Sequence, residues 1–427
     1  MLLVFMGKNK FFLGWKEDNM LFYIKLGYRN LLNNYRRSLK TILSIAIGLS
    51  ACLLAQGFMS YTLLGLRESL INGGIGHIQI YQKGYLKASN DDNLRHLISD
   101  SKTVFRELSN VPGIKLFAPR INFQGMISSG DKSTIFMGTA GLPSREKKLN
   151  SLASLKQGTF LEDKKPFGIV IGSGLARKLH AGVGDTVTLM STLKGGGVNA
   201  IDVEVIGIVE AQIKAYDDVL LLANLKTIQT FMDLPNSVSS IILLLNQTEN
   251  LGKIEPSIQK ICNPLGLEYR TWNQLAGVQY TQPKMFYDLI YLLIMIIIVL
   301  VVVLSIINTL NLTMQERVKE IGTIRSLGTT RLQVGKIFIS ESFLIGLLGG
   351  FFGIILGYAL AGIFNALGGI PIPPPPGHAK GYTAFFKPGF IPALWLWMLF
   401  LMTATVGGFY PAFRAARLQI VEALRWI

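Results

Sequence analysis

The residue types that most often carry chemistry in proteins are sparse in this sequence and stand apart from one another. They are His77, His96, His180, His378, Cys52 and Cys262. None of them has a second His, Cys or carboxylate at the spacing of a metal site. The two cysteines are too few for a disulfide framework, so they leave the redox compartment open. The sequence therefore predicts no metal site and no resident cofactor.

Two other patterns resemble catalytic motifs without completing them. Gly172-Ser173-Gly174 looks like a fragment of a hydrolase nucleophile elbow, but the outer glycines of Gly-x-Ser-x-Gly are absent, so we interpret it as a tight strand-to-helix turn. The adjacent carboxylates Asp91-Asp92 and Asp217-Asp218 are typical of solvated turns. The Gly-x-x-x-x-Gly-Lys-Ser/Thr loop that cradles phosphates is also absent. We expect no enzyme activity in this chain, and any ATP and Mg²⁺ must be bound by a partner.

Composition points to a membrane protein. Half of the 427 residues are hydrophobic, and the mean hydropathy is +0.39. Only 16% of the residues are charged, against roughly 25% in ordinary soluble domains. The apolar residues gather in four runs, each longer than the ~20 residues that a helix needs to cross a ~30 Å hydrocarbon core. All four runs are therefore predicted to span a membrane.

These runs set the predicted domain organisation. The predicted order is a cytoplasmic N-terminus with an amphipathic interfacial helix (1–40), a first span (41–66), an outer domain (67–287), a second span (288–313), a link (314–336), a third span (337–367), a proline-rich outer loop (368–389), a fourth span (390–413) and a tail (414–427). The residues before the first span lack the apolar region and cleavage site of a signal peptide, so that span is expected to be an uncleaved anchor. Met1 and Met20 both stay open as the native start.

Positive charge gives the predicted orientation. The net charge is +16, and lysines and arginines cluster before the first span, in the link and in the tail. The loop between the third and fourth spans has only Lys380 and Lys387. By the positive-inside rule, both termini and the link are expected in the cytoplasm and the outer domain in the periplasm. The excess of positive charge thus reflects the membrane topology, and no nucleic-acid-binding module accompanies it.

Short alternating segments separated by Gly, Asn, Asp and Pro predict an α+β fold for the outer domain. Strands are expected at 77–82, 134–138, 185–190, 202–209 and 239–245. Helices are expected at 93–108, 173–179, 225–232 and 251–261. The predicted fold class is a polytopic α-helical membrane protein with four transmembrane helices and an α+β extracytoplasmic domain inserted between helices 1 and 2.

The link contains a short amphipathic pattern. Apolar residues at positions 318, 321, 324 and 327 form one stripe, and charged residues cover the other faces. Gly328 is a natural terminator, because glycine adopts the left-handed conformation without steric cost. Such a helix can lie on the lipid surface or dock into a groove on a cytoplasmic partner, and the spacing leaves both open.

The third span has a small residue at every fourth position. These residues are Gly349, Gly353, Gly357 and Ala361. Small faces let helix backbones approach closely in lipid, and both packing within the chain and dimerisation would use them. Glu341 lies one turn into this span, where an unpaired carboxylate is costly. We expect it either at the solvated interface or paired with a basic residue of the link.

Several of these segments resemble a known family. Residues 311–360 and the tail Tyr410-Pro-Ala-Phe-Arg-Ala-Ala-Arg-Leu-Gln-Ile-Val-Glu-Ala-Leu-Arg425 resemble the FtsX-like permease domain. Gly76-His-Ile-Gln-Ile-Tyr, Ile171-Gly-Ser-Gly-Leu-Ala and Val183-Gly-Asp-Thr-Val-Thr-Leu resemble the periplasmic core domain of MacB and of the Lol lipoprotein-releasing permeases. The first of these three segments resembles the Lol branch most.

The resemblance implies mechanotransmission. Permeases of this kind dimerise and each binds a cytoplasmic ATPase subunit, whose closure is transmitted through a coupling helix to the outer domain. The residues placed on that helix by the resemblance are Glu316, Arg317, Glu320, Ile321, Gly322, Arg325, Leu327 and Gly328. In the Lol members a lipid-anchored protein is lifted from the outer leaflet, and Phe58, Met59 and Leu63 would line the cavity for its acyl chains.

The function expected from the resemblance is that of a permease subunit of an ATP-binding cassette transporter in the bacterial inner membrane. Lipoprotein release is the first interpretation, and MacB-like efflux and FtsX-like regulation of a periplasmic enzyme are the alternatives. The expected partners are a cytoplasmic ATPase, a second permease that is a copy or a relative, membrane lipids and a periplasmic lipoprotein carrier. Two departures stand out: the region matching the carrier-recruiting hook, 191–200, is short and glycine-rich, and 370–377 is a stiff proline-rich segment.

Overall fold

The computed structural model describes residues 20–88, 93–149, 154–211, 213–373, 382–419 and 423. The chain forms two compact units. Residues 1–62, 284–370 and 383–427 make up the helical unit, and residues 63–283 and 371–382 make up the core unit. Asp91, Asp92, His378, Lys380, the first 19 residues and the second half of the proline-rich segment, 374–377, lie outside the described residues.

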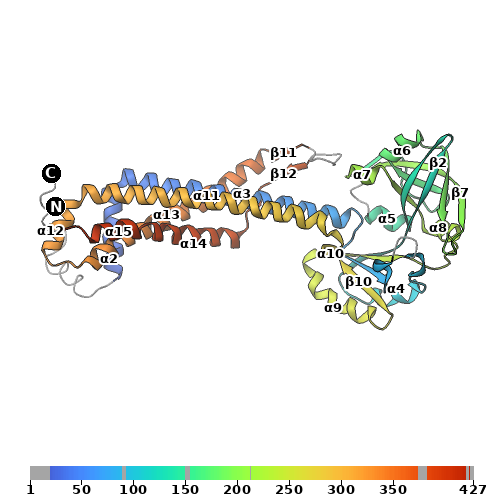
Figure 1. Ribbon diagram of the computed structural model, residues 1–427, viewed down its shortest axis with the longest axis horizontal. Coiled ribbons are helices and arrows are strands. Elements are labelled where there is room, and N and C mark those ends of the chain that lie inside the picture. Colours follow the sequence, from blue (N-terminus) through green and yellow to red (C-terminus); the bar gives the residue numbers. More distant parts are fainter. Residues whose placement is uncertain are drawn as a thin grey trace. The chain divides into compact units, whose positions relative to one another are not determined.

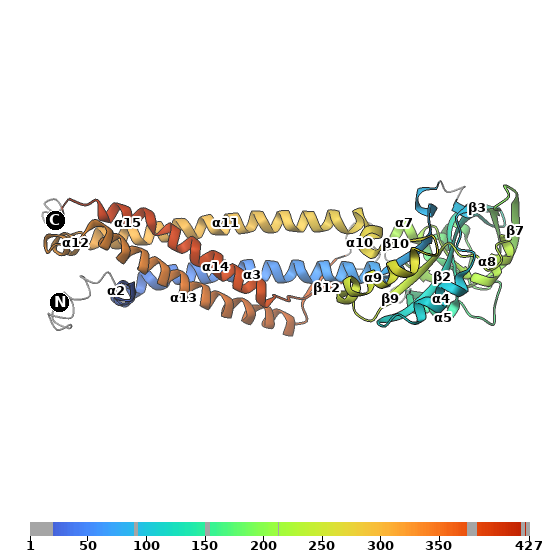
Figure 2. The ribbon, with the colours of Figure 1, turned by 90° about the horizontal axis from the view of Figure 1, so that it is seen from below.

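Long helices dominate the helical unit (Figures 1 and 2). They are α2 (Met20–Asn33), α3 (Tyr35–Asn72), α11 (Val278–Glu316), α12 (Val318–Ser326), α13 (Arg331–Ala366), α14 (Phe390–Gly407) and α15 (Phe409–Ala416). Among the described residues, four helices are long and apolar enough to cross a membrane: α3, α11, α13 and the segment Phe390–Ala416. Each contains or largely overlaps one of the predicted apolar runs, which supports a membrane protein.

Two of these helices are much longer than a membrane span requires. α3 has 38 residues and α11 has 39, so each extends for roughly 57 Å at 1.5 Å per residue, against a hydrocarbon core of ~30 Å. Both pass without a break from residues of the helical unit to residues of the core unit. The chain thus enters and leaves the core unit as continuous helix.

The small residues of α13 lie against α3 of the same chain. A Cβ atom built on Gly349 would lie 2.8 Å from Ile45 Cβ, and one built on Gly353 would lie 2.9 Å from Leu49 Cβ. Gly357 faces Leu53 in the same way, and Ala361, one turn farther, is also buried. This face of α13 therefore packs within the chain, at backbone distances that only small residues permit.

The core unit is built on a ten-stranded sheet (Figure 1). Its strands are β1 (Ile78–Gln82), β2 (Ile114–Ser129), β3 (Lys132–Gly141), β4 (Ser154–Gly158), β5 (Gly168–Gly172), β6 (Thr186–Thr192), β7 (Val198–Glu210), β8 (Leu220–Asn224), β9 (Ser240–Leu245) and β10 (Leu267–Thr271). Its α-helices are α4 (Ser101–Ser109), α5 (Pro143–Leu149), α6 (Ser173–Leu179), α7 (Lys214–Asp217), α8 (Leu225–Phe231), α9 (Leu251–Cys262) and α10 (Trp272–Ala276). Two short strands, β11 (Ile370–Ile372) and β12 (Tyr382–Ala384), pair with each other.

Part of this sheet closes on itself. The strands β2, β3, β8, β5 and β7 are neighbours in that order, and β6 pairs with both β7 and β2, which completes a barrel. On the other side of β2, the strands β9, β1 and β10 continue the sheet as an open flap. The long strand β2 belongs to both parts, because β9 pairs with its first half and β6 with its second.

The predicted α+β class is confirmed, with corrections in detail. The predicted helix 93–108 is wrong in its first half: a short 3₁₀ turn covers Asn93–Arg95, and α4 begins only after Asp100, whose side chain accepts a hydrogen bond from Thr103 N at 3.2 Å. The strand-to-helix turn at Ser173 is confirmed. Asp217 is buried rather than solvated, because its carboxylate accepts from Ser173 Oγ and Gly174 N, both at 2.7 Å.

The packing of α13 on α3 makes a direct prediction. Gly353→Leu should destabilise the protein by about 1–3 kcal/mol, because the new side chain must displace Leu49 or the α3 backbone. Gly362→Leu on the same helix is the matched control, since no atom lies within 4 Å of a Cβ built there. Thermal unfolding of the detergent-solubilised chain measures both, and equal melting temperatures for the two variants would contradict this packing.

Candidate functional site

The helix that the sequence predicts in the link is present as α12. Helix α11 ends at Glu316, Arg317 has non-helical dihedral angles, and α12 begins at Val318. Gly328 follows the helix with φ at +101°, the left-handed conformation that terminates helices. Thr330 and Gln333 then cap the start of α13 reciprocally. Non-helical residues thus separate α12 from α11 on one side and from α13 on the other.

The apolar stripe of α12 faces into the chain for most of its length. Val318, Ile321 and Gly322 are buried, and Ile321 belongs to the same apolar cluster as Met314 and Phe338. Leu327, at the end of the stripe, is 62% exposed. Of the residues assigned to coupling, Ile321 and Gly322 therefore serve packing here, whereas Glu320, Leu327 and Gly328 lie at the surface.

The charged residues of the link tie it to other elements of the helical unit. Arg317 Nε lies 2.9 Å from Glu320 Oε2, and Arg317 Nη2 donates to Asn30 Oδ1 of α2 at 3.1 Å. Glu316 forms an ion pair with Arg37 at the start of α3. The guanidinium of Arg325 donates to the backbone oxygen of Leu418 in the tail. The end of α11 is thus connected to α3, and α12 with its N-terminal flanking residue is connected to α2 and the tail.

Glu341 lies behind these contacts. Its side chain is buried in α13, with Asn30 and Arg317 in its surroundings. The neighbouring Ser340 Oγ donates to Tyr23 O of α2 at 2.9 Å. Of the two expectations for Glu341, solvation at the interface is wrong, because its side chain is buried. Pairing with a basic residue of the link is not observed among the described residues, since Arg317 pairs with Glu320 instead. Helix α2 is thereby held on α13 by buried polar contacts.

The residues assigned to an acyl-chain cavity lie half-buried along α3. The Phe58 ring centroid is 6.1 Å from that of Phe386, which also contacts Phe364 at 5.4 Å. The Asn365 side chain donates to Phe386 O at 2.7 Å and accepts from Phe386 N at 2.8 Å. Phe58 thus faces an aromatic cluster of this chain, and Met59 and Leu63 continue along the same helix.

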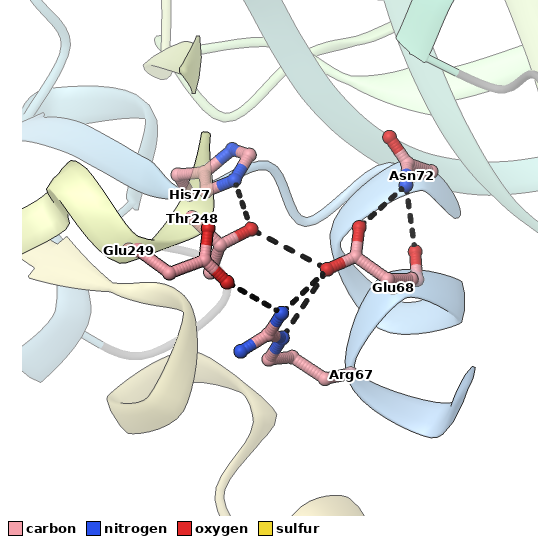
Figure 3. Close-up of polar contacts among 6 residues, drawn as sticks. All are labelled: Arg67, Glu68, Asn72, His77, Thr248 and Glu249. Atoms are coloured by element: carbon pink, nitrogen blue, oxygen red, sulfur yellow. Dashed lines mark hydrogen bonds and ion pairs between the residues drawn. The ribbon is translucent and has the colours of Figure 1, made fainter. Parts of the chain in front are cut away.

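A second polar cluster surrounds the end of α3 in the core unit (Figure 3). Arg67 Nη2 lies 3.0 Å from Glu68 Oε1 and 3.3 Å from Glu249 Oε1. Asn72 Nδ2 donates to Glu68 O at 3.0 Å, one turn back along the helix. Thr248 Oγ1 donates to Glu68 Oε1 at 3.4 Å. The last turns of α3 are thereby connected to the turn that follows β9.

His77 completes this cluster, which we call the α3 junction (Arg67, Glu68, Asn72, His77, Thr248 and Glu249). Leu245 N donates to His77 Nδ1 at 3.2 Å, so that nitrogen carries no proton. The other nitrogen, Nε2, therefore carries the proton and donates to Thr248 Oγ1 at 3.0 Å (Figure 3). Both ring nitrogens of a neutral imidazole are used, and a second proton would displace the Leu245 N–H.

The surroundings of His77 favour this neutral form. Burial lowers the pKa of His77 below its usual 6.5, and Arg67 and Lys115 lower it further. The carboxylates of Glu68 and Glu249 act in the opposite direction, but desolvation is the largest effect. Sequence spacing does not indicate this role of His77, because its partner Thr248 is 171 residues away.

A buried ion pair lies close to the junction. Arg120 Nε and Nη2 donate to the two carboxylate oxygens of Glu146, each at 2.7 Å, and Arg120 Nη1 donates to Gly74 O at 2.6 Å. Gly74 follows the end of α3 by two residues. This bidentate pair joins β2, α5 and the segment after α3, and removal of either partner would leave a buried charge. In the part of the chain that the structure describes, no group of three His, Cys, Asp or Glu could hold a metal.

Comparison with known families matches two stretches of the chain. The family described as the MacB-like periplasmic core domain matches residues 38–261. The family described as the FtsX-like permease C-terminal matches residues 292–420. The first stretch contains α3 and nearly all strands of the core unit, and the second contains the link and the helices that follow it.

Individual relatives are similar over most of the chain. The lipoprotein-releasing system transmembrane protein LolE of Haemophilus influenzae is 25% identical over 75% of this chain and 79% of its own length. LolC of Neisseria meningitidis is 23% identical over 90% and 93%. The macrolide export ATP-binding/permease protein MacB of Bdellovibrio bacteriovorus is 24% identical over 96% of this chain and 63% of its own. The crystal structure of the periplasmic region of MacB from Actinobacillus actinomycetemcomitans matches 49% of this chain and 95% of its own, with 15% identity and a TM-score of 0.36.

The α3 junction predicts a pH dependence. The unfolded chain protonates His77 near pH 6.5, whereas the folded chain resists protonation, so the stabilising contribution is complete above that pH and decreases as pH falls below it. We expect the Leu245 amide to lose hydrogen-exchange protection between pH 7 and pH 5, after correction for intrinsic exchange. His77→Asn keeps an acceptor near the Nδ1 position but does not titrate, so its protection should stay flat. Parallel profiles for the two proteins would refute the assignment.

Proposed function

The chain belongs to the FtsX- and MacB-type family of ATP-binding cassette transporter permeases, related to the Lol permeases, and from this premise we propose that it releases lipid-anchored proteins from a membrane by mechanotransmission. Family membership makes it a membrane permease subunit with a periplasmic domain and implies an ATPase partner. In the proposal that ATPase binds the ATP and Mg²⁺ for which this sequence has no P-loop.

The observation that carries the proposal is the continuity of α3 between two polar clusters. At its start, Arg37 pairs with Glu316 of the link. At its end, Arg67 and Glu68 belong to the α3 junction. Because an uninterrupted helix transmits displacement along its axis, movement of α12 by an ATPase would move the end of α3 and the core unit that it enters. No cargo needs to pass through the chain for this to work.

The extent of the matches with LolC and LolE supports the proposal of lipoprotein release. LolC and LolE are matched along most of their own length, whereas the MacB relative has further chain beyond the match. In this proposal Phe58, Met59 and Leu63 face the lipid anchor once the aromatic cluster around Phe386 opens. MacB-like efflux and FtsX-like regulation share the same coupling and would differ only in what the core unit acts on.

The proposal also gives the compartment of each part of the protein and the partners that it meets there. Both termini and α12 lie in the cytoplasm, the four candidate spans cross the bacterial inner membrane, and the core unit lies in the periplasm. A second permease, either a copy or a relative, faces the apolar side of α11, where Leu293, Ile297 and Leu300 are exposed among the described residues. A periplasmic carrier receives the cargo.

The coupling surface can be tested at Leu327. Leu327→Asp should abolish stimulation of the partner's ATP hydrolysis, because it places a charge on the exposed end of the stripe without disturbing the bundle. Hydrolysis by the purified permease–ATPase complex in lipid nanodiscs is the measurement. Ile135→Asp is the matched control, since Ile135 is a comparably exposed apolar residue on β3.

Two further results would complete the test. Gly322→Asp should reduce expression and melting temperature as well as hydrolysis, because Gly322 is buried. Mass spectrometry of the complex should find acylated peptides co-purifying with it. Unchanged hydrolysis in Leu327→Asp would remove α12 as the coupling helix, and an ATPase complex without acylated peptides would favour efflux or regulation.

A further inference from the structure

Helices α3 and α11 lead into and out of the core unit, and each contains a residue type that weakens helices. In α3 this residue is Gly65, and in α11 it is Pro283. The division between the two units falls between residues 62 and 63 of α3 and between residues 283 and 284 of α11. Both residues therefore lie where a continuous helix passes from one unit to the other.

Packing does not require a glycine at position 65. At the two other glycines of α3, Gly48 and Gly57, a Cβ atom would lie 2.9 Å from Ile298 Cγ2 and 2.8 Å from Pro388 N. At Gly65, by contrast, nothing among the described residues lies within 4 Å of such a Cβ, and the residue is exposed. Alanine would fit there and would favour the helix, because glycine loses more conformational freedom on folding. Gly65 thus weakens α3 without a gain in packing.

Pro283 removes a hydrogen bond from the body of α11. It is the sixth residue of the helix, so it lies beyond the first turn, whose N–H groups have no intrahelical acceptor in any case. Proline has no N–H, so the carbonyl of Gln279 receives no hydrogen bond from position 283, and the proline ring crowds that carbonyl. Helix α11 is therefore weakened at this turn.

Contacts fix α3 on either side of Gly65 rather than at it. Before it, the Tyr61 ring centroid lies 5.6 Å from that of Phe385 in the helical unit. After it, Arg67 Nη2 lies 3.3 Å from Glu249 Oε1 in the α3 junction (Figure 3). None of residues 58–70 is buried in the chain. The turn around Gly65 thus depends on its own helix propensity.

Pro283 has the same position relative to the contacts of α11. Before it, the Tyr280 ring centroid lies 4.9 Å from that of Trp272 in the core unit. After it, α11 packs on α3 within the helical unit, where Ile298 faces Gly48. None of residues 277–301 is buried in the chain. Each connecting helix therefore has a weakened turn between the contacts that fix it to the two units.

We propose that Gly65 and Pro283 form a paired hinge, at which α3 and α11 bend together and the core unit changes its orientation. A hinge consists of a few residues that absorb a change in backbone dihedral angles while the elements around them stay rigid. Two helices connect the units, so a weak turn in one helix alone would be restrained by the other. The inference rests on the proposed function for its use, and it adds that a displacement transmitted along α3 becomes a reorientation of the core unit.

Distances between the two units test the hinge in the full chain. Spin labels at Leu367→Cys in the helical unit and Lys102→Cys in the core unit, both at exposed positions, report the distribution of distances by double electron–electron resonance in nanodiscs. The two native cysteines are buried, so labelling is directed to the introduced ones. The hinge variant, Gly65→Ala with Pro283→Ala, should lose most of the width that the wild type shows, because alanine favours the helix at both turns.

The matched control combines Gly362→Ala with Pro256→Ala. Gly362 in α13 is also a helical glycine for which nothing among the described residues lies within 4 Å of an added Cβ. Pro256 is also the sixth residue of its helix, α9. Neither lies on α3 or α11, so the control should keep the wild-type width. Equal widths in the wild type, the hinge variant and the control would overturn the inference.

Hydrogen exchange measures the two turns separately, with single variants. Gly65→Ala should slow exchange of the amides of residues 66–69 about two- to fivefold. Pro283→Ala, which restores the hydrogen bond to Gln279, should slow exchange of the amides of residues 284–287 at least about tenfold. Wild-type amides at 66–69 that exchange as slowly as those at 349–353 in α13 would also overturn the inference.

The result is separable from that of the proposed function, which ATPase stimulation tests. Loss of width in the hinge variant of a chain that stimulates no ATPase would keep the hinge and remove mechanotransmission. Normal stimulation together with equal widths would remove the hinge and leave mechanotransmission in place.

Discussion

Close backbone contact between α13 and α3 is the constraint on which the helical unit depends. In lipid there is little hydrophobic drive between helices, so their association relies on packing at short range. Gly349, Gly353 and Gly357 make that packing possible against α3, while Gly346 and Gly350 on another face meet Ala404 and Trp397 of α14. Helix α13 therefore holds α3 and α14 at once, and α2 packs on it as well through Ser340 and Tyr23. A helix held in this way moves with its neighbours rather than independently.

Polar contacts at both ends of α3 also oppose its separation from the neighbouring elements. Buried hydrogen-bonded groups are expensive to separate, because each would be left unsatisfied. At one end Arg37 of α3 forms an ion pair with Glu316, the last residue of α11. At the other end His77 is fixed by Leu245 N and Thr248. Thr248 also donates to Glu68 of α3, so both ends of the helix are connected to other elements by side-chain contacts.

Features that depend on local sequence could be predicted, whereas those that depend on pairing across the chain could not. The apolar runs gave the candidate spans, alternation gave β1 and β9, and the turn at Ser173 was expected from its glycines. The division of β2 between β9 and β6, however, is a matter of register with strands far away in sequence. Burial of Asp217 and the inward face of Ile321 likewise depend on partners that periodicity does not identify. The boundaries of the link, 314–336, and of the outer domain, 67–287, stay predictions.

The small exposed surface of α12 limits how coupling could work. With Val318, Ile321 and Gly322 buried, the apolar stripe offers a partner little beyond Leu327, so the helix alone would bury too little area for tight binding. The value of the link to the proposed mechanism lies instead in its contacts with the rest of the chain: Glu316 at the end of α11 pairs with Arg37, Arg317 donates to Asn30, and Arg325 donates to Leu418 O. A partner that grips α12 weakly but displaces it would still move α2 and α3, because those contacts are made within the chain. Rigidity inside the permease, rather than affinity at the contact, is then the property that the link must supply.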